Sequence, residues 1–524
     1  MKEAGHKSGS EPSDDPASFI SNPLHFGSPP PRKAMAAASS WIPPTLPDCD
    51  NAPGWVLLDM RCYIADLPNA TTATGVTSSG LPIQVTFRAA RPPTLSYLCV
   101  HCPGMEFPGS APKVVATHAD LVLLRVPINP DAVLSAMTRF WDYFVYRAHP
   151  PLLDLLPNPY PKCFNDSEAA LLSGDDGGGY VVAALRSRVP RRDPNGGALI
   201  RTEFDLHLYR SSNADEGWIS KRLSVEEPVR DTLVPLPDAV ADDMLYHETG
   251  KTITVGGKRG TVAWVDLWRG ILLCNLLDEC PVLRDVPLPL PARGNWDRLL
   301  QECNPNFLRD ITISRHKDSI KYIEIEIRPP RELKKTTRDS YLEWVRRNSR
   351  NSQLVRRDGW RATTWSMPLP VGSWEDWRRE CDVDVNALTI DTSKPWLSKP
   401  LSKLRGSDAK AILQSLSVAY PTISMDDDAV YLLSKVDNLE VVVAVDVRKN
   451  TLRGVAELDI QKDFSLMPTY CSSEISSYLK KTTGTLEALK LTEKEALKPT
   501  EVREGTDQQN EAWEEACMAA YTPE

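Results

Sequence analysis

The sequence predicts an all-β protein built as an irregular β-propeller, and three observations lead to this prediction. From Trp55 to Ile460, short runs of Val, Leu, Ile and aromatic residues alternate with clusters of Gly, Pro, Asp and Ser, as in strands joined by turns. Helical periodicity is nearly absent between residues 55 and 325. The strands also recur at a spacing that suits four-stranded blades of roughly 40–50 residues. Paired β-sandwiches would contain the same short strands and are the alternative fold.

Residues 1–53 differ from the rest of the chain in composition. They hold ten prolines together with Ser, Gly and charged residues. Such a segment buries too little apolar surface to offset the entropy lost when it becomes ordered. We therefore expect a disordered leader, followed by the β domain at residues 54–461.

The segment TVAWVDLWRGILLCN is the clearest hairpin within the β domain. An aromatic strand is followed by a tight turn at Arg269-Gly270 and by a second apolar strand. Trp264 and Trp268 are four residues apart, so on a regular strand they share one face. With Leu272 and Leu273, they are expected to form part of the core between sheets.

Residues 328–358 interrupt the β pattern with a basic insertion. Ten Lys and Arg residues against four Asp and Glu give it a net charge of +6, whereas the whole chain carries −9. Three interpretations are open: a solvated loop, a nuclear-import or protein-docking segment, and a nucleic-acid contact, the least favoured of the three. Basic pairs and two aromatic side chains that could stack on bases are the candidate interaction residues: Lys334, Lys335, Tyr341, Trp344, Arg346, Arg347, Arg356 and Arg357.

Residues 462–524 form an acidic tail, with seven basic and twelve acidic residues. Within it, GTLEALKLTEKEALK places apolar residues at helical spacing. The tail is therefore expected to be partly helical or disordered.

Several features predict an intracellular protein, either cytoplasmic or nuclear. The first thirty residues lack the apolar run of a signal peptide, and no stretch of eighteen apolar residues occurs. The eleven cysteines are an odd number and lie mostly in strand-like apolar runs, as at Cys62, Cys99 and Cys274. Reduced cysteine behaves in this way as a small buried hydrophobe. We expect no membrane partner.

Thr249-Gly250-Lys251-Thr252 is similar to the end of a phosphate-binding loop, but the context differs. That loop requires a glycine five residues before Gly250 and a helix after the lysine. Position 245 is leucine, and the strand-like TITV follows. A β-turn before a strand is the favoured interpretation.

The remaining motifs predict no catalytic residue, no cofactor and no metal site. Cys99-Val-His-Cys102 lacks the second pair that structural zinc requires, so buried strand cysteines are favoured. The acidic runs at 175–177 and 425–428 lack the spaced ligands of a calcium loop and suit turns. No Gly-x-Ser-x-Gly sequence occurs, and no histidine stands in a nucleophile–base pattern.

The runs WVLLDMRCYIADLP, YFVYRA, YVVAAL, DLHLYRSS and above all WVDLWRGILLCNLLDECPVLRDVPLPLP resemble a known family. This is DUF1618, a plant family of unknown function that is expanded in grasses, and the likeness covers most of residues 53–460. Its strand rhythm is similar to that of the F-box-associated propellers of plants. The family has no established catalytic or binding residues, so the resemblance implies a fold and no activity.

Together these features predict a non-catalytic protein-interaction module with an unknown protein partner, because propellers present loops on a rigid ring. The alternative is an enzyme or small-molecule binder that uses the central channel or the loop face. Inward-facing His, Asp or Glu residues with strongly shifted pKa values would favour this alternative. Exposed aromatic residues on one face would favour the interaction module.

Overall fold

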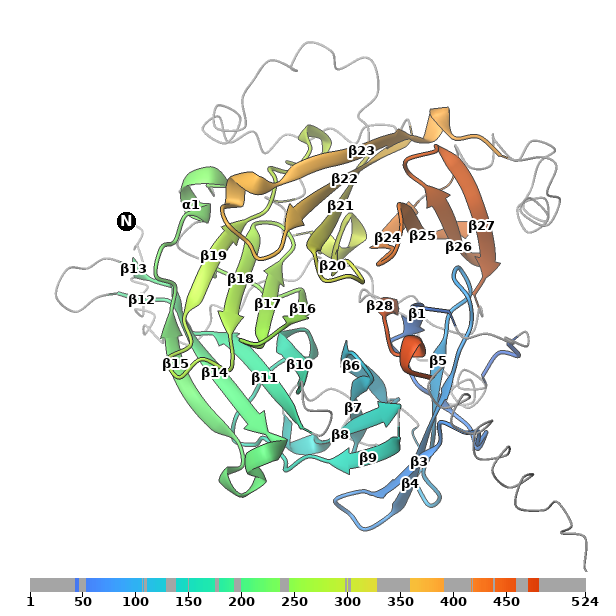
Figure 1. Cartoon of the computed structure of the whole chain (residues 1–524), viewed down its shortest axis with the longest axis vertical. Helices are drawn as coiled ribbons and strands as arrows, with labels where there is room; N and C mark the ends of the chain where they lie inside the picture. The colour runs from blue at the N-terminus through green and yellow to red at the C-terminus, as the bar shows by residue number, and fades with distance from the viewer. Residues whose placement is uncertain are drawn as a thin grey trace, which may run out of the picture.

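The computed structural model describes residues 43–46, 53–105, 107, 111–128, 138–148, 150–174, 179–192, 199–235, 245–296, 299, 303–327, 359–390, 416, 418–436, 439–458 and 470–479. Within these residues, six four-stranded sheets follow one another along the chain. Figure 1 shows them arranged as blades around a ring, with β6, β10, β16, β20, β24 and β28 nearest its centre. The predicted all-β propeller is confirmed.

The first three blades come from the N-terminal half of the chain. Blade 1 consists of β1 (Val56–Asp59), β2 (Tyr63–Ile64), β3 (Ala73–Val76), β4 (Pro82–Arg88) and β5 (Tyr97–His101). Blade 2 consists of β6 (Lys113–His118), β7 (Leu121–Pro127), β8 (Trp141–Ala148) and β9 (Pro151–Leu155). Blade 3 consists of β10 (Ala169–Ser173), β11 (Tyr180–Ser187), β14 (Glu203–Arg210) and β15 (Ile219–Ser224), with a small side ribbon of β12 (Arg191–Arg192) and β13 (Leu199–Ile200).

The next three blades, like blades 2 and 3, add their strands in chain order from the centre outward, whereas the strand order in blade 1 is β2-β5-β4-β3. Blade 4 consists of β16 (Lys251–Gly256), β17 (Thr261–Asp266), β18 (Gly270–Asn275) and β19 (Leu283–Pro287). Blade 5 consists of β20 (Arg309–Ile313), β21 (Ser319–Ile327), β22 (Trp360–Pro368) and β23 (Arg378–Asp384). Blade 6 consists of β24 (Val418–Ile423), β25 (Ala429–Val436), β26 (Leu439–Asp446) and β27 (Thr451–Glu457), and β28 (Tyr470–Ser473) follows it.

Helices are short, and most lie between strands. α1 (Arg230–Leu233) is a single α-helical turn before blade 4, and residues 476–479, after β28, are also helical. The 3₁₀ turns are η2 (Thr138–Phe140), η3 (Asp166–Glu168), η4 (Ser211–Glu216), η5 (Arg293–Asn295), η6 (Pro305–Phe307), η8 (Trp374–Asp376) and η9 (Val385–Ala387). No helix among the described residues has the length and apolar character needed to cross a bilayer.

The ring is closed by the pairing of its two ends. Tyr470–Ser473 lie antiparallel to Val56–Asp59, with Val56 opposite Ser473 and Asp59 opposite Tyr470. β1 in turn joins blade 1 through Ser96, whose N–H donates to the Leu57 carbonyl at 2.8 Å. The propeller therefore extends beyond the boundary expected at residue 461 and includes part of the expected tail. The helix expected within GTLEALKLTEKEALK lies outside the described residues.

Apolar packing fills every gap between neighbouring blades. Along β7, Leu121 and Leu123 pack against blade 3, whereas Val122, Leu124 and Val126 pack against blade 1. Strands covered on both faces read as continuous apolar runs, which explains sequences such as LVLLRVP. Six such clusters, one for each pair of adjacent blades, occur in the described part. Each sheet thus packs against two neighbours, which excludes the alternative of paired sandwiches.

The predicted hairpin is present, but its two tryptophans do not share a face. β17 and β18 pair around the turn that contains Arg269, and Trp264 is fully buried between blades 3 and 4. The strand ends at Asp266, so Trp268 lies in the turn and packs instead in the cluster between blades 5 and 6. The strand alternation assumed for residue 268 is therefore wrong.

A short part of the expected leader lies against the propeller. The carbonyl of Pro44 accepts a hydrogen bond from the Tyr97 hydroxyl at 2.8 Å. Leu46 packs beside Tyr63, Tyr97 and Cys99. Residues 43–46 are thus placed on blade 1, and the other residues before Pro53 lie outside the described part.

Replacement of Trp264 by alanine should destabilise the fold by roughly 3–5 kcal/mol, the usual cost of removing a buried large aromatic side chain. Its indole N–H donates to the Glu168 carbonyl at 2.7 Å, so this acceptor would also lose its partner. Leu290, which is 50% exposed, provides a matched Leu290→Ala control that should leave stability nearly unchanged. Urea unfolding followed by circular dichroism measures both, and equal midpoints for the two variants would contradict the packing role of Trp264.

Candidate functional site

The inner strands surround a cavity of about 190 Å³. Its wall is built from β6, β16, β20, β24 and β28, together with η3 just before β10, so that all six blades contribute. Pockets for drug-sized ligands hold roughly 300–1,000 Å³, so the cavity suits a smaller molecule.

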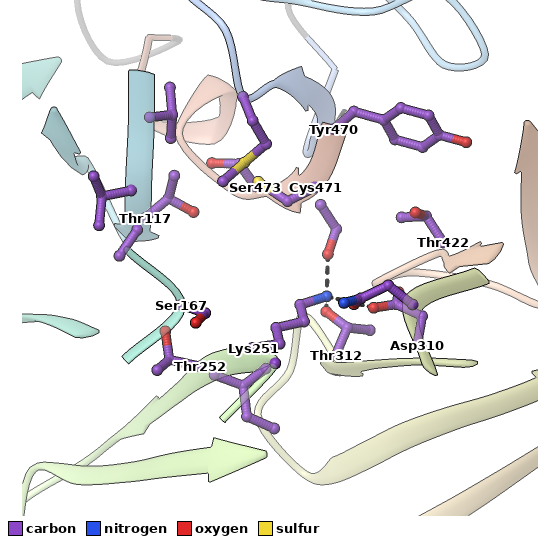
Figure 2. A pocket seen from close by; sticks show the side chains of 18 of the residues that line it. Thr117, Ser167, Lys251, Thr252, Asp310, Thr312, Thr422, Tyr470, Cys471 and Ser473 are labelled. Atoms are coloured by element: carbon purple, nitrogen blue, oxygen red, sulfur yellow. Dashed lines mark hydrogen bonds and ion pairs between the residues drawn. The ribbon is translucent and has the colours of Figure 1, made fainter. Parts of the chain in front are cut away.

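Hydroxyl side chains lie at several points of a cavity wall whose surface is otherwise largely apolar, and Figure 2 shows those that it labels. They come from different blades and are Thr117, Ser167, Thr252, Thr312, Thr422 and Ser473. Some of them also connect inner strands of different blades: the Thr252 hydroxyl donates to the Ala169 carbonyl at 2.9 Å, and Thr312 Oγ1 lies 2.9 Å from Ser472 Oγ. Because hydroxyls both donate and accept hydrogen bonds, this wall can contact a polar ligand from several sides.

One ion pair lies directly in the wall. Lys251 Nζ is 2.6 Å from Asp310 Oδ1, and Asp310 Oδ2 accepts the N–H of Ile423 at 3.3 Å. Figure 2 shows Lys251 and Asp310 meeting beside Thr312. The pair joins β16, β20 and β24, so its first effect is to hold three inner strands in register.

Further basic residues lie at the same end of the channel. Lys113, Lys251 and Arg309 are the first residues of β6, β16 and β20, and Arg61 pairs with Lys113 in an antiparallel bridge. Lys113 and Arg61 both line the cavity. Burial lowers the pKa of Lys113, and the nearby Arg125 and Arg61 lower it further. The placement of these four basic residues concentrates positive charge at this end of the channel.

A different polar cluster lies where the inner strands end. Nδ1 of His118, the last residue of β6, accepts the N–H of Ser173 at 3.0 Å. Lys317 Nζ lies 3.0 Å from Nε2 of the same ring and 3.3 Å from the Glu474 carboxylate. Glu474 also accepts the N–H of Ala119 at 3.1 Å. We call His118, Lys317 and Glu474 the His118 cluster; it ties β28 to blades 2 and 5.

His118 is held in its neutral form by this environment. Burial lowers its pKa to about 3, with the Lys317 charge as a second cause. Nδ1 accepts the Ser173 N–H, so the neutral ring carries its proton on Nε2, and a second proton on Nδ1 would meet an N–H group rather than an acceptor. Gly256, the last residue of β16, has φ +76°, and a Cβ atom there would lie 3.2 Å from Nε2. Glycine is thus required both for its backbone conformation and for the close approach to the ring.

Sequence reasoning singled out one fragment of this site, Thr249–Thr252, but only as a possible phosphate-binding loop; Gly250, Lys251 and Thr252 of this fragment line the cavity. Lys251 belongs to the fragment Thr249–Thr252, and the strand expected after the fragment is β16, which begins at Lys251. Sequence reasoning missed Arg61, Lys113 and His118. One usable signal was present: the inner strands are short and carry Ser, Thr, Lys or Asp, whereas the strand after each is longer or more apolar.

The candidate interaction residues of the basic insertion, from Lys334 to Arg357, lie outside the described residues, so their role stays a prediction. Other motifs have structural roles. Cys99 lies on β5, and burial raises its pKa to about 11. In the acidic run after β24, Asp428 forms an ion pair with Arg448 at 2.5 Å. Asp427 is paired with Arg453.

The WVDLWRGIL segment stabilises a turn rather than the cavity. Asp266 Oδ1 accepts the N–H groups of Trp268 at 3.0 Å and Arg269 at 3.2 Å. The buried Arg269 side chain donates to the Tyr246 carbonyl at 3.1 Å and pairs with Asp231. In the described part of the chain, these residues connect blade 4 to the segment that precedes it.

Comparison with protein families gives one match. Residues 264–431 match the model of DUF1618, a protein family of unknown function. The DUF1618 match extends from Trp264 in β17 to Tyr431 in β25 and includes Asp310, Thr312 and Thr422 of the cavity wall. Lys113, Thr117 and Lys251 precede it. No curated protein matches the chain.

Solved structures similar to the chain share little sequence with it. One chain of a nidogen/laminin complex is 8% identical, with 77% of this chain and 97% of that chain covered and a TM-score of 0.30. The Nup133 β-propeller domain of Vanderwaltozyma polyspora is 10% identical, with 72% and 73% covered and a TM-score of 0.30. TolB from Acinetobacter baumannii is 9% identical, with 78% and 67% covered and a TM-score of 0.29.

The buried neutral His118 should make stability depend on pH. Between pH 6.5 and about 3 the unfolded chain binds a proton at this residue that the folded protein does not, so stability falls as pH falls through this window. From pH 7 to pH 5, the loss from this group should be about 2 kcal/mol. In His118→Asn, the amide oxygen can still accept the Ser173 N–H but does not titrate, so this part of the loss should be absent. Equal pH dependence of the unfolding free energy in both proteins would contradict the assignment.

Proposed function

We propose that this protein is a non-catalytic binding protein that holds a small polar ligand in the central channel of its propeller. The observation that carries the proposal is the cavity itself, whose wall combines hydroxyl groups with basic residues from separate blades. Convergent polar groups in a largely preformed concave site are what small-molecule recognition requires. The rigid ring also fixes these groups before a ligand arrives, which lowers the entropic cost of binding.

The chemistry of the cavity supports binding rather than catalysis. Burial raises the pKa of the Cys471 thiol to about 12, so the thiolate, which is the nucleophilic form, is scarce at neutral pH. His118 is neutral, and its Nδ1 already accepts the Ser173 N–H. Lys251 and Asp310 are bound to each other. None of these groups is arranged as a nucleophile beside a free base.

A variant that fills the cavity tests this proposal. Thr117 lies in the wall, and Thr117→Phe should occupy much of the space while β6, which tolerates aromatic residues as strands do, still forms. The panel consists of glucose, gluconate, glucose 6-phosphate and inorganic phosphate. At least one of them should raise the melting temperature of the unaltered protein saturably, since a ligand at 100 times its Kd stabilises by about 2.7 kcal/mol.

The matched control is Thr74→Phe, at an exposed position of β3 on the rim. The stabilisation should disappear in Thr117→Phe and persist in Thr74→Phe. Absence of any stabilisation in the unaltered protein, or its persistence in Thr117→Phe, would contradict the proposal. Circular dichroism of each variant establishes that the propeller is folded.

A second function, protein interaction through the basic insertion, is favoured by where the insertion leaves the ring. Ile327 and Trp360 are directly opposed partners of β21 and β22, so residues 328–359 begin and end side by side. The insertion therefore starts and ends where the pairing of β21 with β22 stops. Its ten basic and four acidic residues give it a net charge of +6. An acidic protein surface is the partner that this charge suits, and nucleic acid is the alternative.

Deletion of residues 330–357 should leave the propeller intact. The join then reads Ile327-Arg-Pro-Asp-Gly-Trp360, and Pro-Asp-Gly is a favoured turn sequence. The unfolding midpoint should be nearly unchanged, whereas binding to a poly-glutamate peptide, and its steep weakening by salt, should be lost. Unfolding of the deletion variant would mean that the insertion is part of blade 5. Unchanged binding would exclude the insertion as the docking segment, and binding of duplex DNA alone would favour nucleic acid.

We infer that the protein works inside the cell, in the cytoplasm or nucleus. All nine cysteines in the described residues are free thiols, and four of them are buried. Free buried cysteines are usual in a reducing compartment. Intact thiols in the protein isolated without reducing agent from its own cells would support this inference, and disulfides would contradict it.

A further inference from the structure

The basic end of the channel contains more positive than negative charge. From this imbalance we infer that the ligand carries an anionic group, a phosphate or a carboxylate, which binds between Arg61 and Lys113. This inference rests on the proposed function, because it specifies the chemistry of the molecule held in the cavity.

The carboxylates that line the cavity are already paired. Each lies within ion-pair distance of a basic side chain: Asp166 with Arg125 at 2.8 Å, Asp310 with Lys251 at 2.6 Å, and Glu474 with Lys317 at 3.3 Å. The single negative charge of each carboxylate is thus already matched by one positive charge. Any further basic side chain in the wall is therefore not balanced by these three carboxylates.

Two of the four basic residues in the wall are paired as well. Lys251 has Asp310 as its partner. The fully buried Arg309 lies 3.0 Å from Glu324, and its NH1 donates to the Leu267 carbonyl at 2.8 Å. Neither of these side chains requires a ligand to compensate its charge.

Arg61 and Lys113 differ from them in this respect. Within the described residues, neither side chain has a carboxylate at ion-pair distance. Asp59 is near, but the contact that it makes with Arg61 is to the backbone, whose N–H donates to Oδ1 at 3.0 Å. Asp166, whose charge reaches Lys113, is already bound to Arg125. Among the described residues, Arg61 and Lys113 are thus two adjacent cations with no carboxylate at ion-pair distance.

Such an arrangement is unfavourable without a ligand and favourable with an anion. Two like charges held together repel each other, and partial burial weakens the screening by water. The lowered pKa of Lys113 has these same causes, burial first and then the neighbouring arginines. A phosphate or carboxylate between Arg61 and Lys113 would accept charge-assisted hydrogen bonds, which are the stronger kind.

The rest of the ligand should carry hydroxyl groups. Figure 2 shows Thr117 and Ser167 on one side of the cavity and Thr312 and Thr422 on the other. Because these hydroxyls lie among largely apolar wall surface, they match a compact molecule that has both hydroxyl groups and C–H faces, as a sugar does. The class of ligand is therefore a small sugar phosphate or sugar acid.

Calorimetric titration with four probes tests this inference: glucose, gluconate, glucose 6-phosphate and inorganic phosphate. Glucose has no charge, gluconate adds a carboxylate, and glucose 6-phosphate adds a phosphate. We expect at least one charged sugar to bind about tenfold more tightly than glucose, because one hydrogen bond to a charged group has roughly this effect. Raising the salt concentration should weaken binding of the charged sugar and leave glucose unaffected.

Lys113→Met and Arg61→Met remove each charge while keeping an apolar stem. Each should weaken binding of the charged sugar about tenfold and change glucose binding little. Lys258→Met, in the exposed turn between β16 and β17, is the control and should have no effect. The salt dependence of the unaltered protein tests the inference even where a variant does not fold.

The outcomes separate this inference from the proposed function. If glucose binds as tightly as the charged sugars and Thr117→Phe abolishes its binding, the anionic group is wrong and the channel ligand stands. If a charged sugar binds but neither Lys113→Met nor Arg61→Met weakens it, the assigned position is wrong. If no probe binds the unaltered protein, both proposals are overturned.

Discussion

Four residues near the C-terminus pair with four residues that follow the leader, and this contact turns a row of sheets into a ring. Tyr470–Ser473 and Val56–Asp59 are about 400 residues apart, a separation at which closing a free loop would be costly in entropy. The blades between them hold the two ends close, so the pairing closes a gap rather than a free loop. Side chains then secure it: Trp55 and Leu57 of the first strand pack with Tyr431 and Val442 of blade 6.

The cavity depends on the same contact. Tyr470, Cys471 and Ser473 belong to the wall, and Glu474 completes the His118 cluster at the far end. Without β28, the channel would be open on one side and Lys317 would lose its carboxylate. Closure of the ring and formation of the candidate site are therefore one structural event.

The fold could be predicted from the sequence because its physical cause is local. Strands such as LVLLRVP and YVVAAL are apolar on both faces because each sheet is covered on both faces, and Gly, Pro and Asp mark the turns. The site could not be predicted in the same way. Lys113, Lys251 and Asp310 are distant in sequence, and only the ring brings the first residues of their strands together. Trp268 shows a related limit: the Asp266 side chain ends β17 early, and strand alternation does not extend past that point.

Since β28 forms both the seam of the ring and one wall of the cavity, occupancy and closure are thermodynamically linked. A ligand that contacts β28 and the opposite strands binds the closed ring and not the open one, so it stabilises closure by its own binding free energy. While no anion is bound, the repulsion between Arg61 and Lys113 opposes closure of the ring. This is because Arg61 lies two residues after β1, the strand that pairs with β28. An anion there removes that repulsion next to the seam. The residues that we propose to bind an anion are therefore placed where such binding would have a large effect on the integrity of the ring.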